Sequence, residues 1–257
     1  MKPNILFFKN IMLAGLLAGC VTAADRPASQ AVIEAAIENP ARLPEDRERD
    51  ARDQPAVTLA MLDLQPGDAV ADLFGGGGYY AELLAGVVGA QGQVILQNNK
   101  GYAKWVNERL QQRYVDNRVP PITVLLSEVT DLQLPAAALD AAVMIMSYHD
   151  LYFYRPASGF DRVDMADFFT QLRAALKPGG RLLIVDHAAP DGTGNTLVQD
   201  LHRIELAFVQ NDIESRGFRL VATSDALRNP DDPRTQNVFA KDIRGRTDRF
   251  IMLFEKN

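Results

Sequence analysis

The sequence predicts an α/β fold in which a doubly wound, mostly parallel sheet of seven strands closes with an antiparallel last strand. From Asp68 onward, short apolar segments alternate with longer amphipathic ones, the pattern of a parallel sheet covered on both faces. The first apolar segment, 69–74, runs into four consecutive glycines, 75–78, and then into a helix. The last two apolar segments, 218–224 and 249–255, are joined by a polar loop without a helix, so we expect the final strand to insert antiparallel.

The predicted elements of this domain follow one another in a regular order. We expect strands at 69–74, 93–97, 122–127, 139–146, 181–186, 218–224 and 249–255. We expect helices at 79–88, 102–114, 164–176 and 197–216. The Lys177–Gly180 turn, KPGG, separates the third of these helices from the fifth strand, because proline and two glycines interrupt regular structure.

The first twenty residues are expected to be a targeting segment that is not part of the fold. Lys2 and Lys9 precede or flank the apolar run 11–19, which is too short to span a bilayer comfortably. The run ends in LAGC, which resembles the lipobox of bacterial lipoproteins, whose cysteine becomes the lipidated first residue. The resemblance implies export to the periplasmic side of the envelope and a lipid anchor at Cys20. A plain signal peptide with an incidental cysteine is the alternative, and as the only cysteine Cys20 forms no intrachain disulfide.

The mature chain is expected to have two parts. Residues 21–54 form a small-residue tether and an N-terminal helical arm, with a helix at 30–38 and a charged segment at 41–53. Residues 55–257 form the sheet domain, which begins with a proline-initiated helix. The charged segment is either a solvated face or a lid over the substrate, and its arginines are Arg42, Arg47, Arg49 and Arg52.

The net charge excludes nucleic acid as an expected partner. The formal charge of the chain is −6, and removal of the targeting segment with its two lysines leaves −6 − 2 = −8. An acidic protein repels a phosphate backbone, and no stripe of lysine and arginine offsets that repulsion. A small molecule is therefore the expected substrate class. The sequence indicates no particular oligomeric state.

Ligands of such sheets bind outside the carboxyl ends of the strands, so residues directly after the strands are the site candidates. Glycines after the first strand permit positive φ and close approach of a ligand to the backbone. The helix behind them offers unpaired N–H groups and the positive end of its dipole. The candidates at the other strand ends are 97–99, 128–131, 147–150 and 186–187.

Two motifs carry a resemblance to a known family. Asp72-x-x-x-Gly76-x-Gly78 and the LKPGG turn at 176–180, together with the antiparallel finish, resemble class I S-adenosylmethionine-dependent methyltransferases. Segments 72–80, 148–150 and 202–205 further resemble a group of predicted exported bacterial methyltransferases. The resemblance covers about residues 56–257 and implies a Rossmann-like fold, S-adenosylmethionine as cofactor and methyl transfer to an acceptor.

The resemblance implies a set of cofactor-binding residues. Asp72, Gly76, Gly77 and Gly78 would hold the methionine part of the cofactor. Asn98 stands where the family carries an acid that binds the ribose, and an amide is a weaker acceptor for hydroxyls than a carboxylate. Glu128 and Val129 match the contacts to adenine. Phe74 replaces the first glycine of the usual loop, and Tyr79 and Tyr80 serve either helix packing or the cofactor.

Three other functions compete with methyl transfer. Gly76-x-Gly78-x-x-Ala81 also fits the dinucleotide fingerprint of dehydrogenases, but that fingerprint requires an acid where Asn98 stands. A catalytically degenerate, methyltransferase-like binding or scaffold protein of the cell envelope is the main alternative, because the ribose acid is lost. A metal-dependent site formed by His149, Asp150 and His187 is disfavoured, since two histidines without close spacing are poor evidence, and we expect no metal.

Two of the three histidines follow strands at the expected active edge. We predict that His149 is the general base or substrate-positioning group, and that Tyr148 and Asp150 set its orientation. His187 follows the fifth strand and is expected to satisfy a loop hydrogen bond. His202 is expected on a helix, where it orients or caps. No DNA-methyltransferase motif follows the fourth strand, so a small-molecule acceptor remains the expectation.

Overall fold

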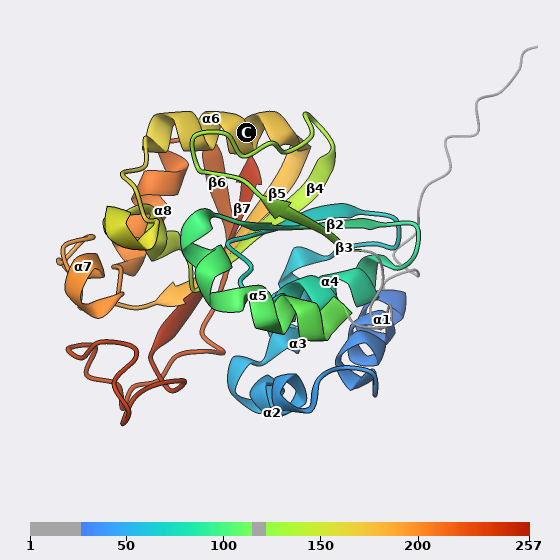
Figure 1. Ribbon diagram of the computed structural model, residues 1–257, viewed down its shortest axis with the longest axis horizontal. Helices are drawn as coiled ribbons and strands as arrows, with labels where there is room; N and C mark the ends of the chain where they lie inside the picture. The colour runs from blue at the N-terminus through green and yellow to red at the C-terminus, as the bar shows by residue number, and fades with distance from the viewer. Residues whose placement is uncertain (1–26, 115–121) are drawn as a thin grey trace, which may run out of the picture.

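The computed structural model describes residues 27–114 and 122–257. Within them lies one seven-stranded sheet with the strand order β3-β2-β1-β4-β5-β7-β6 (Figure 1). Neighbouring strands from β3 to β5 pair in parallel, and β7 pairs antiparallel with both β5 and β6. The fold class predicted from the sequence is therefore confirmed. The strands are β1 (Ala69–Leu73), β2 (Gln93–Asn98), β3 (Ile122–Leu126), β4 (Leu139–Ile145), β5 (Leu176–His187), β6 (Phe218–Ser224) and β7 (Arg249–Lys256).

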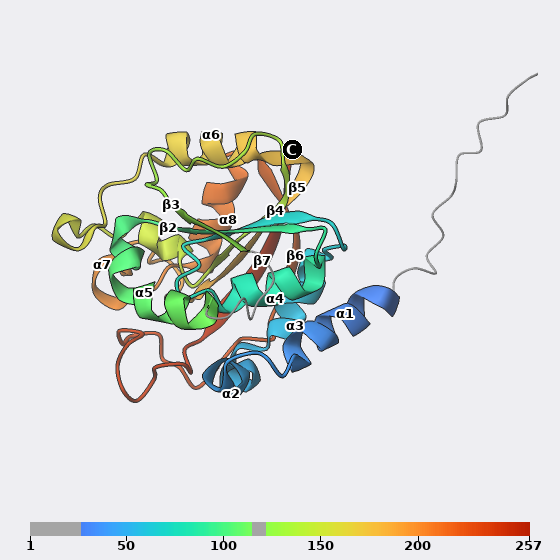
Figure 2. The same ribbon diagram turned by 45° about the vertical axis from the view of Figure 1, so that its right-hand side comes forward.

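Helices cover both faces of the sheet and enclose two separate apolar cores. On one face α1 (Pro27–Glu38), α3 (Pro55–Leu62) and α4 (Tyr79–Val88) pack over the strands. On the other face lie α6 (Met165–Ala175), α8 (Leu206–Glu214) and the short helix η3 (Tyr148–Leu151). Figure 1 and Figure 2 show these two layers. The strands β1, β4 and β5 contribute buried side chains to both cores, which explains their almost continuous apolar sequence.

The remaining helices lie around the carboxyl edge of the sheet. They are α2 (Pro44–Asp53), α5 (Lys100–Tyr114), η4 (Pro156–Ser158) and α7 (Val198–Leu201). In Figure 2, α2 lies at the end of the molecule toward which the parallel strands point. No helix within the described ranges is long and apolar enough to cross a membrane. The predicted targeting segment and its Cys20 fall outside the described residues.

The N-terminal arm is an integral part of the fold. Asp53, at the end of α2, forms a buried ion pair with Arg249 of β7, 2.7 Å between Oδ1 and Nη1. Arg249 also donates to the Arg52 carbonyl at 2.8 Å. Arg42 is almost fully buried and binds both carboxylate oxygens of Asp50. A purely solvated face is therefore wrong for Arg42, whereas Arg47 and Arg52 do face solvent.

Two sequence-based boundaries differ from the structure for physical reasons. The helix predicted at 197–216 is broken into α7 and α8, because Ile204 pairs with Ala188, directly after β5. Ile204 donates its N–H to the His187 carbonyl at 3.0 Å, which a continuous helix would not allow. The KPGG turn loops out of β5, since strand pairing jumps from Leu139↔Leu176 to Ala141↔Arg181. Gly179, at φ +70°, makes this turn possible.

Candidate active site

The glycine loop after β1 is held in a tight turn by the amide side chains at the end of β2. Phe74, Gly76 and Gly78 all have positive φ, at +52°, +58° and +82°. Asn98 accepts a hydrogen bond from the Gly76 N–H at 2.9 Å and donates one to the Gly76 carbonyl at 3.0 Å. Gln97 accepts from the Phe74 N–H at 3.2 Å. These contacts support a left-handed backbone at Phe74 that a non-glycine residue rarely adopts.

Asp72 lies beneath the glycine loop with one carboxylate oxygen unpaired. The residue is buried, and its Oδ2 has no hydrogen-bond partner among the described residues. A Cβ on Gly75 would stand 2.5 Å from that oxygen, so only glycine leaves room for the carboxylate. Burial raises the pKa of Asp72 to about 7, and a hydrogen bond from the Ala81 amide opposes part of that rise. A buried carboxylate with a free oxygen is suited to bind a positively charged ligand group.

A pocket of about 200 Å³ opens in front of this loop. The loop and Asp72 form one side, α2 contributes Arg49, and α5 contributes Tyr102 and Arg109. Arg49 stacks on the Tyr79 ring, 4.0 Å from guanidinium carbon to centroid, and pairs with Asp53. Arg109 has no ion pair within the described part of the chain. Among the described residues, the pocket therefore presents one buried carboxylate oxygen without a hydrogen-bond partner and one guanidinium without an ion-pair partner.

The structure brings only some of the predicted cofactor residues to this pocket. Asp72, Gly76 and Gly77 line it, whereas four others are absent from the lining that the described residues form: Gly78, Asn98, Glu128 and Val129. Glu128 is half-buried and accepts a hydrogen bond from the Lys100 N–H at 3.2 Å. Both polar groups of Asn98 bond Gly76, and ribose binding by Asn98 stays a prediction.

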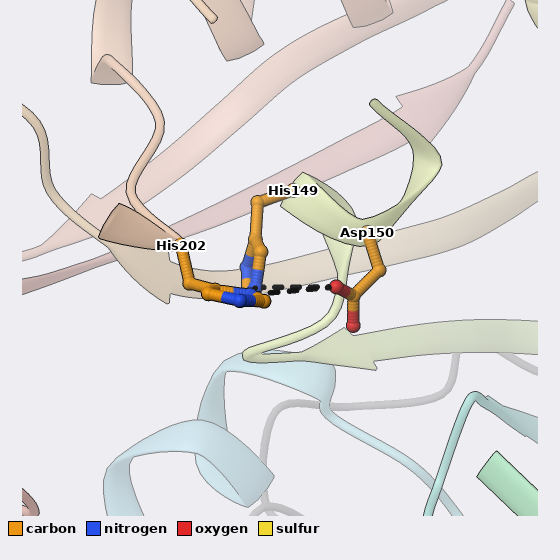
Figure 3. A group of neighbouring side chains, drawn as sticks. All are labelled: His149, Asp150 and His202. Atoms are coloured by element: carbon orange, nitrogen blue, oxygen red, sulfur yellow. Dashed lines mark hydrogen bonds and ion pairs between the residues drawn. The ribbon is translucent and has the colours of Figure 1, made fainter. Parts of the chain in front are cut away.

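A histidine cluster lies at the ends of β4 and β5, behind the pocket. His149 Nδ1 lies 2.8 Å from Asp186 Oδ1, and the His149 N–H donates to Asp186 Oδ2 at 2.8 Å. On the other side of the ring, Nε2 lies 3.4 Å from Asp150 Oδ1 and 3.3 Å from His202 Nδ1. Figure 3 shows the two imidazoles and the Asp150 carboxylate converging on one point. Tyr102, which lines the pocket, donates its hydroxyl to Asp150 Oδ2 at 2.5 Å.

The pKa of His149 is shifted in the opposite direction to the pKa values of His187 and His202. Burial lowers the pKa of His149, but Asp186 and Asp150 outweigh burial and raise it to about 9. Burial lowers the pKa of His187 to about 3 and, with the charge on His149, that of His202 to about 4. His149 therefore carries a proton at neutral pH while the other two stay neutral. As a general base, His149 would first have to lose that proton.

Tyr148 does not contact His149 in the way that the prediction required. Asp150 is only one of the two carboxylates that lie beside the His149 ring. The Tyr148 hydroxyl donates to Asp212 of α8 at 2.5 Å, on the side of the core that packs against α6 and α8. Asp186 instead makes the two short bonds that orient His149. His187 satisfies a loop hydrogen bond as expected, with its Nδ1 2.7 Å from the Thr247 hydroxyl.

Sequence reasoning missed several residues that the fold brings together. Asp186 directly ends the apolar part of β5, so the strand-end rule names it as a candidate, yet no role was assigned to it. Tyr102 and Arg109 lie on α5, a helix whose sequence carries no chemical motif. His202 reaches the cluster only because the chain leaves α7 there with φ +55°. No pattern in a single sequence indicates such a break.

Comparison with known proteins agrees with this geometry. A methyltransferase-domain family model matches residues 72–184. The ubiquinone/menaquinone biosynthesis C-methyltransferase UbiE of Serratia proteamaculans is 31% identical over 137 residues, 52% of this chain and 48% of the relative. The chain thus spans about half the length of the curated relatives it matches.

Solved structures resemble the fold over most of its length. A SAM-dependent methyltransferase from Aquifex aeolicus superposes with a TM-score of 0.56 at 19% identity, covering 89% of this chain and 98% of that one. Geranyl diphosphate C-methyltransferase from Streptomyces coelicolor A3(2), in complex with S-adenosyl-L-homocysteine, gives 0.56 at 14% identity over 87% and 88%. At sequence identities of 14–19%, the similarity to these structures shows a shared fold only.

The pocket fits the cofactor of that fold at its methionine end. S-adenosylmethionine carries an ammonium group and a carboxylate there, and Asp72 and Arg109 offer the opposite charges. Because position 75 is a glycine, no Cβ stands between Asp72 and the pocket. If S-adenosylmethionine bound here, it would supply an electrophilic sulfonium methyl group. The chain therefore has the fold of class I methyltransferases, and its residues 72–184 match the methyltransferase-domain family model.

Proposed function

We propose that this protein is an S-adenosylmethionine-dependent methyltransferase that acts on a small-molecule acceptor. The observation that carries the proposal is Asp72, whose buried Oδ2 lacks a partner among the described residues and borders the pocket in front of the glycine loop. Leaving a buried carboxylate oxygen unpaired is costly, so its retention is best explained by a cationic ligand group. The methyltransferase-domain match begins at this same residue.

The residues of this chain would contribute binding, orientation and removal of water. Asp72 and Arg109 bind the charged ends of the methionine moiety, and α2 covers the loop through the Asp53–Arg249 pair. Methyl transfer requires mainly that nucleophile, methyl and sulfur are aligned. His149, held by Asp186 and Asp150, is the candidate group for positioning the acceptor and moving a proton.

A small acceptor is supported by the size and cover of the pocket. The arm helix α2 closes one side, and Tyr102 and Met146 form part of the wall toward β4. The acidic charge of the chain disfavours nucleic acid, as argued above. The named substrates of the similar proteins belong to those proteins.

Titration of S-adenosylmethionine and S-adenosyl-L-homocysteine into the full chain tests this function. We expect binding, and we expect Asp72→Asn to weaken S-adenosylmethionine binding about 10- to 100-fold, because a charge-assisted hydrogen bond is lost. Asp131→Asn, on an exposed turn, is the matched control and should bind normally. Absence of heat with both ligands at millimolar concentration would contradict the proposal.

One observation favours the rival, a catalytically degenerate binding or scaffold protein. Asn98 stands in the place of the ribose acid and uses both polar groups on Gly76. A protein that never binds the cofactor has no need to free that side chain. The same titration separates the two functions, since the rival predicts that neither ligand binds.

We further propose that the mature protein is exported and anchored to the membrane by lipid at Cys20. The support is the sequence alone: the lysine-flanked apolar run and the LAGC lipobox pattern. Cells labelled with a palmitate analogue should show label on the wild-type chain in the membrane fraction and none on Cys20→Ala. Label that persists on Cys20→Ala, or protein found only in the cytosol, would contradict it.

A further inference from the structure

We propose that His149, His202 and Asp150 form a binding site for a divalent first-row transition-metal ion such as Zn²⁺. The three residues come from η3 and the end of α7, and one ligand atom of each faces the same point (Figure 3). Two imidazoles and one carboxylate are a ligand set that binds Zn²⁺, Fe²⁺ or Co²⁺ and leaves coordination positions open. The site itself does not depend on the proposed methyltransferase activity.

The spacing of the ligand atoms matches that set. Ligands bound at about 2.0–2.1 Å in a tetrahedral arrangement stand about 3.3–3.4 Å apart. His149 Nε2 is 3.3 Å from His202 Nδ1 and 3.4 Å from Asp150 Oδ1. The third separation, His202 Nδ1 to Asp150 Oδ1, is 3.9 Å, so these two groups need to approach by about half an ångström.

Each of two ligands is held on its far side by a second group. Asp186 binds His149 Nδ1, which is the carboxylate–histidine arrangement that orients metal-binding imidazoles. Tyr102 binds Asp150 Oδ2 and leaves Oδ1 for the shared point. These outer contacts fix the orientation of both ligands before any ion binds, which lowers the entropic cost of binding.

His202 is held in place by unusual local structure. Its ring packs against Phe153, 4.6 Å between centroids, and against Phe239 at 5.0 Å. The next residue, Arg203, is fully buried and binds both carboxylate oxygens of Asp232. The left-handed backbone of His202, at φ +55°, is thus maintained by its neighbours. Such strained positions cluster at functional sites.

A proton satisfies the cluster less completely than a metal ion does. One N–H on His149 Nε2 points to either His202 Nδ1 or Asp150 Oδ1, and the other acceptor is left without it. A cation at the shared point contacts all three atoms. The carboxylates of Asp150 and Asp186 together offset a divalent charge. The side chains of the other two ligands remain partly exposed to solvent, 11% for Asp150 and 16% for His202.

The position of the site indicates a use, although that use rests on the proposed function. Tyr102 lines the pocket and also binds Asp150, so the cluster lies directly behind the pocket wall. A metal ion there would act as a Lewis acid on an acceptor oxygen and lower the pKa of its hydroxyl.

The test is metal binding by the untagged full chain, measured without any methyl donor, in a Cys20→Ser background that removes the only thiol. We expect one Zn²⁺ per chain by elemental analysis and calorimetry, visible absorption bands with Co²⁺, and no competition from millimolar Mg²⁺ because imidazole ligands disfavour it. His202→Ala should weaken Zn²⁺ binding at least 100-fold. Asp186→Asn, which acts through His149, should weaken it about 10- to 100-fold.

His187→Gln is the matched control, because His187 lies beside the cluster but binds Thr247. It should bind Zn²⁺ as the wild type does. Wild-type protein that takes up neither Zn²⁺ nor Co²⁺ overturns the site, and so does uptake that His202→Ala leaves unchanged in a folded variant. Failure of S-adenosylmethionine binding alters neither result, so the two proposals fail separately.

Discussion

The side-chain amide of Asn98 makes two hydrogen bonds with the backbone of one residue, Gly76, at 2.9 and 3.0 Å. One of these bonds requires a donor, because the Nδ2 group faces the Gly76 carbonyl. A carboxylate has no donor and would place two oxygens against each other. The residue that stands where the family carries its ribose acid therefore stabilises the glycine loop.

Asn98→Asp is thus expected to destabilise the protein and not to tighten cofactor binding. We expect a loss of about 1–3 kcal/mol in the free energy of unfolding, the cost of a buried carbonyl left without its donor. Asn99→Asp is the matched control: Asn99 accepts from the Tyr102 N–H at the start of α5, a role an acid fills equally well. Denaturant titrations at pH 7.5 compare the two, and tighter S-adenosylmethionine binding by a stable Asn98→Asp would contradict this prediction.

The stability of the cofactor-free protein should depend on pH through Asp72. Because burial raises its pKa from 3.8 to about 7, the folded state holds the Asp72 proton over a range in which the unfolded state has lost it. Stability from this group is therefore greatest below pH 4 and falls as the pH rises to about 7, by on the order of 4 kcal/mol.

Asp72→Asn removes this contribution. The difference in unfolding free energy, wild type minus Asp72→Asn, should fall between pH 5 and pH 8 when measured in urea at each pH. A difference that is flat across this range would show that the Asp72 carboxyl titrates normally.

The second charge of the proposed cofactor site can be tested at Arg109. Arg109→Gln should weaken S-adenosylmethionine binding about 10-fold or more, because the ligand carboxylate loses a charged donor. Lys104→Gln removes an exposed cation from the same helix outside the pocket lining, and should leave the affinity unchanged at 150 mM salt. Equal effects of the two variants in calorimetry would mean that only long-range charge matters.

The ion pair between Asp53 and Arg249 should anchor the arm. Asp53→Ala leaves a buried guanidinium without its carboxylate, so we expect a loss of about 3–5 kcal/mol in stability. Asp161→Asn, which breaks the exposed pair with Lys100, should cost less than about 1 kcal/mol. Neighbouring arginines lower the pKa of Asp53 against burial, so its contribution is present above pH 4 and lost on further acidification.

Once a methyl acceptor is identified, His149 and His187 should differ in turnover. His149→Gln is expected to lower turnover on the order of a hundredfold to ten-thousandfold, because it removes the group that Asp186 and Asp150 hold at the pocket edge. His187→Gln should keep near-normal turnover. Turnover and thermal midpoint are measured together, and a His149→Gln variant that melts early yet turns over normally would assign His149 a structural role.

The mostly parallel sheet and the place of its glycine loop were predictable from local pattern. Apolar strands such as 69–74, a glycine turn and alternating helices predict a parallel sheet. Each of these features depends on neighbouring residues and on burial, so it can be recognised in the sequence. The carboxyl-edge rule then named the strand ends that carry the glycine loop and His149.

The composition of the histidine cluster was decided by tertiary contacts. His202 meets His149 only because Ile204 binds the end of β5 and Arg203 binds Asp232, which together break a segment that reads as one helix. Asp186 and Tyr102 join the cluster from β5 and α5, elements far apart in sequence. Helical propensity amounts to tenths of a kcal/mol per residue, and buried pairings outweigh it. Tertiary contacts also decide the role of Asn98, because its partner Gly76 follows the end of a neighbouring strand.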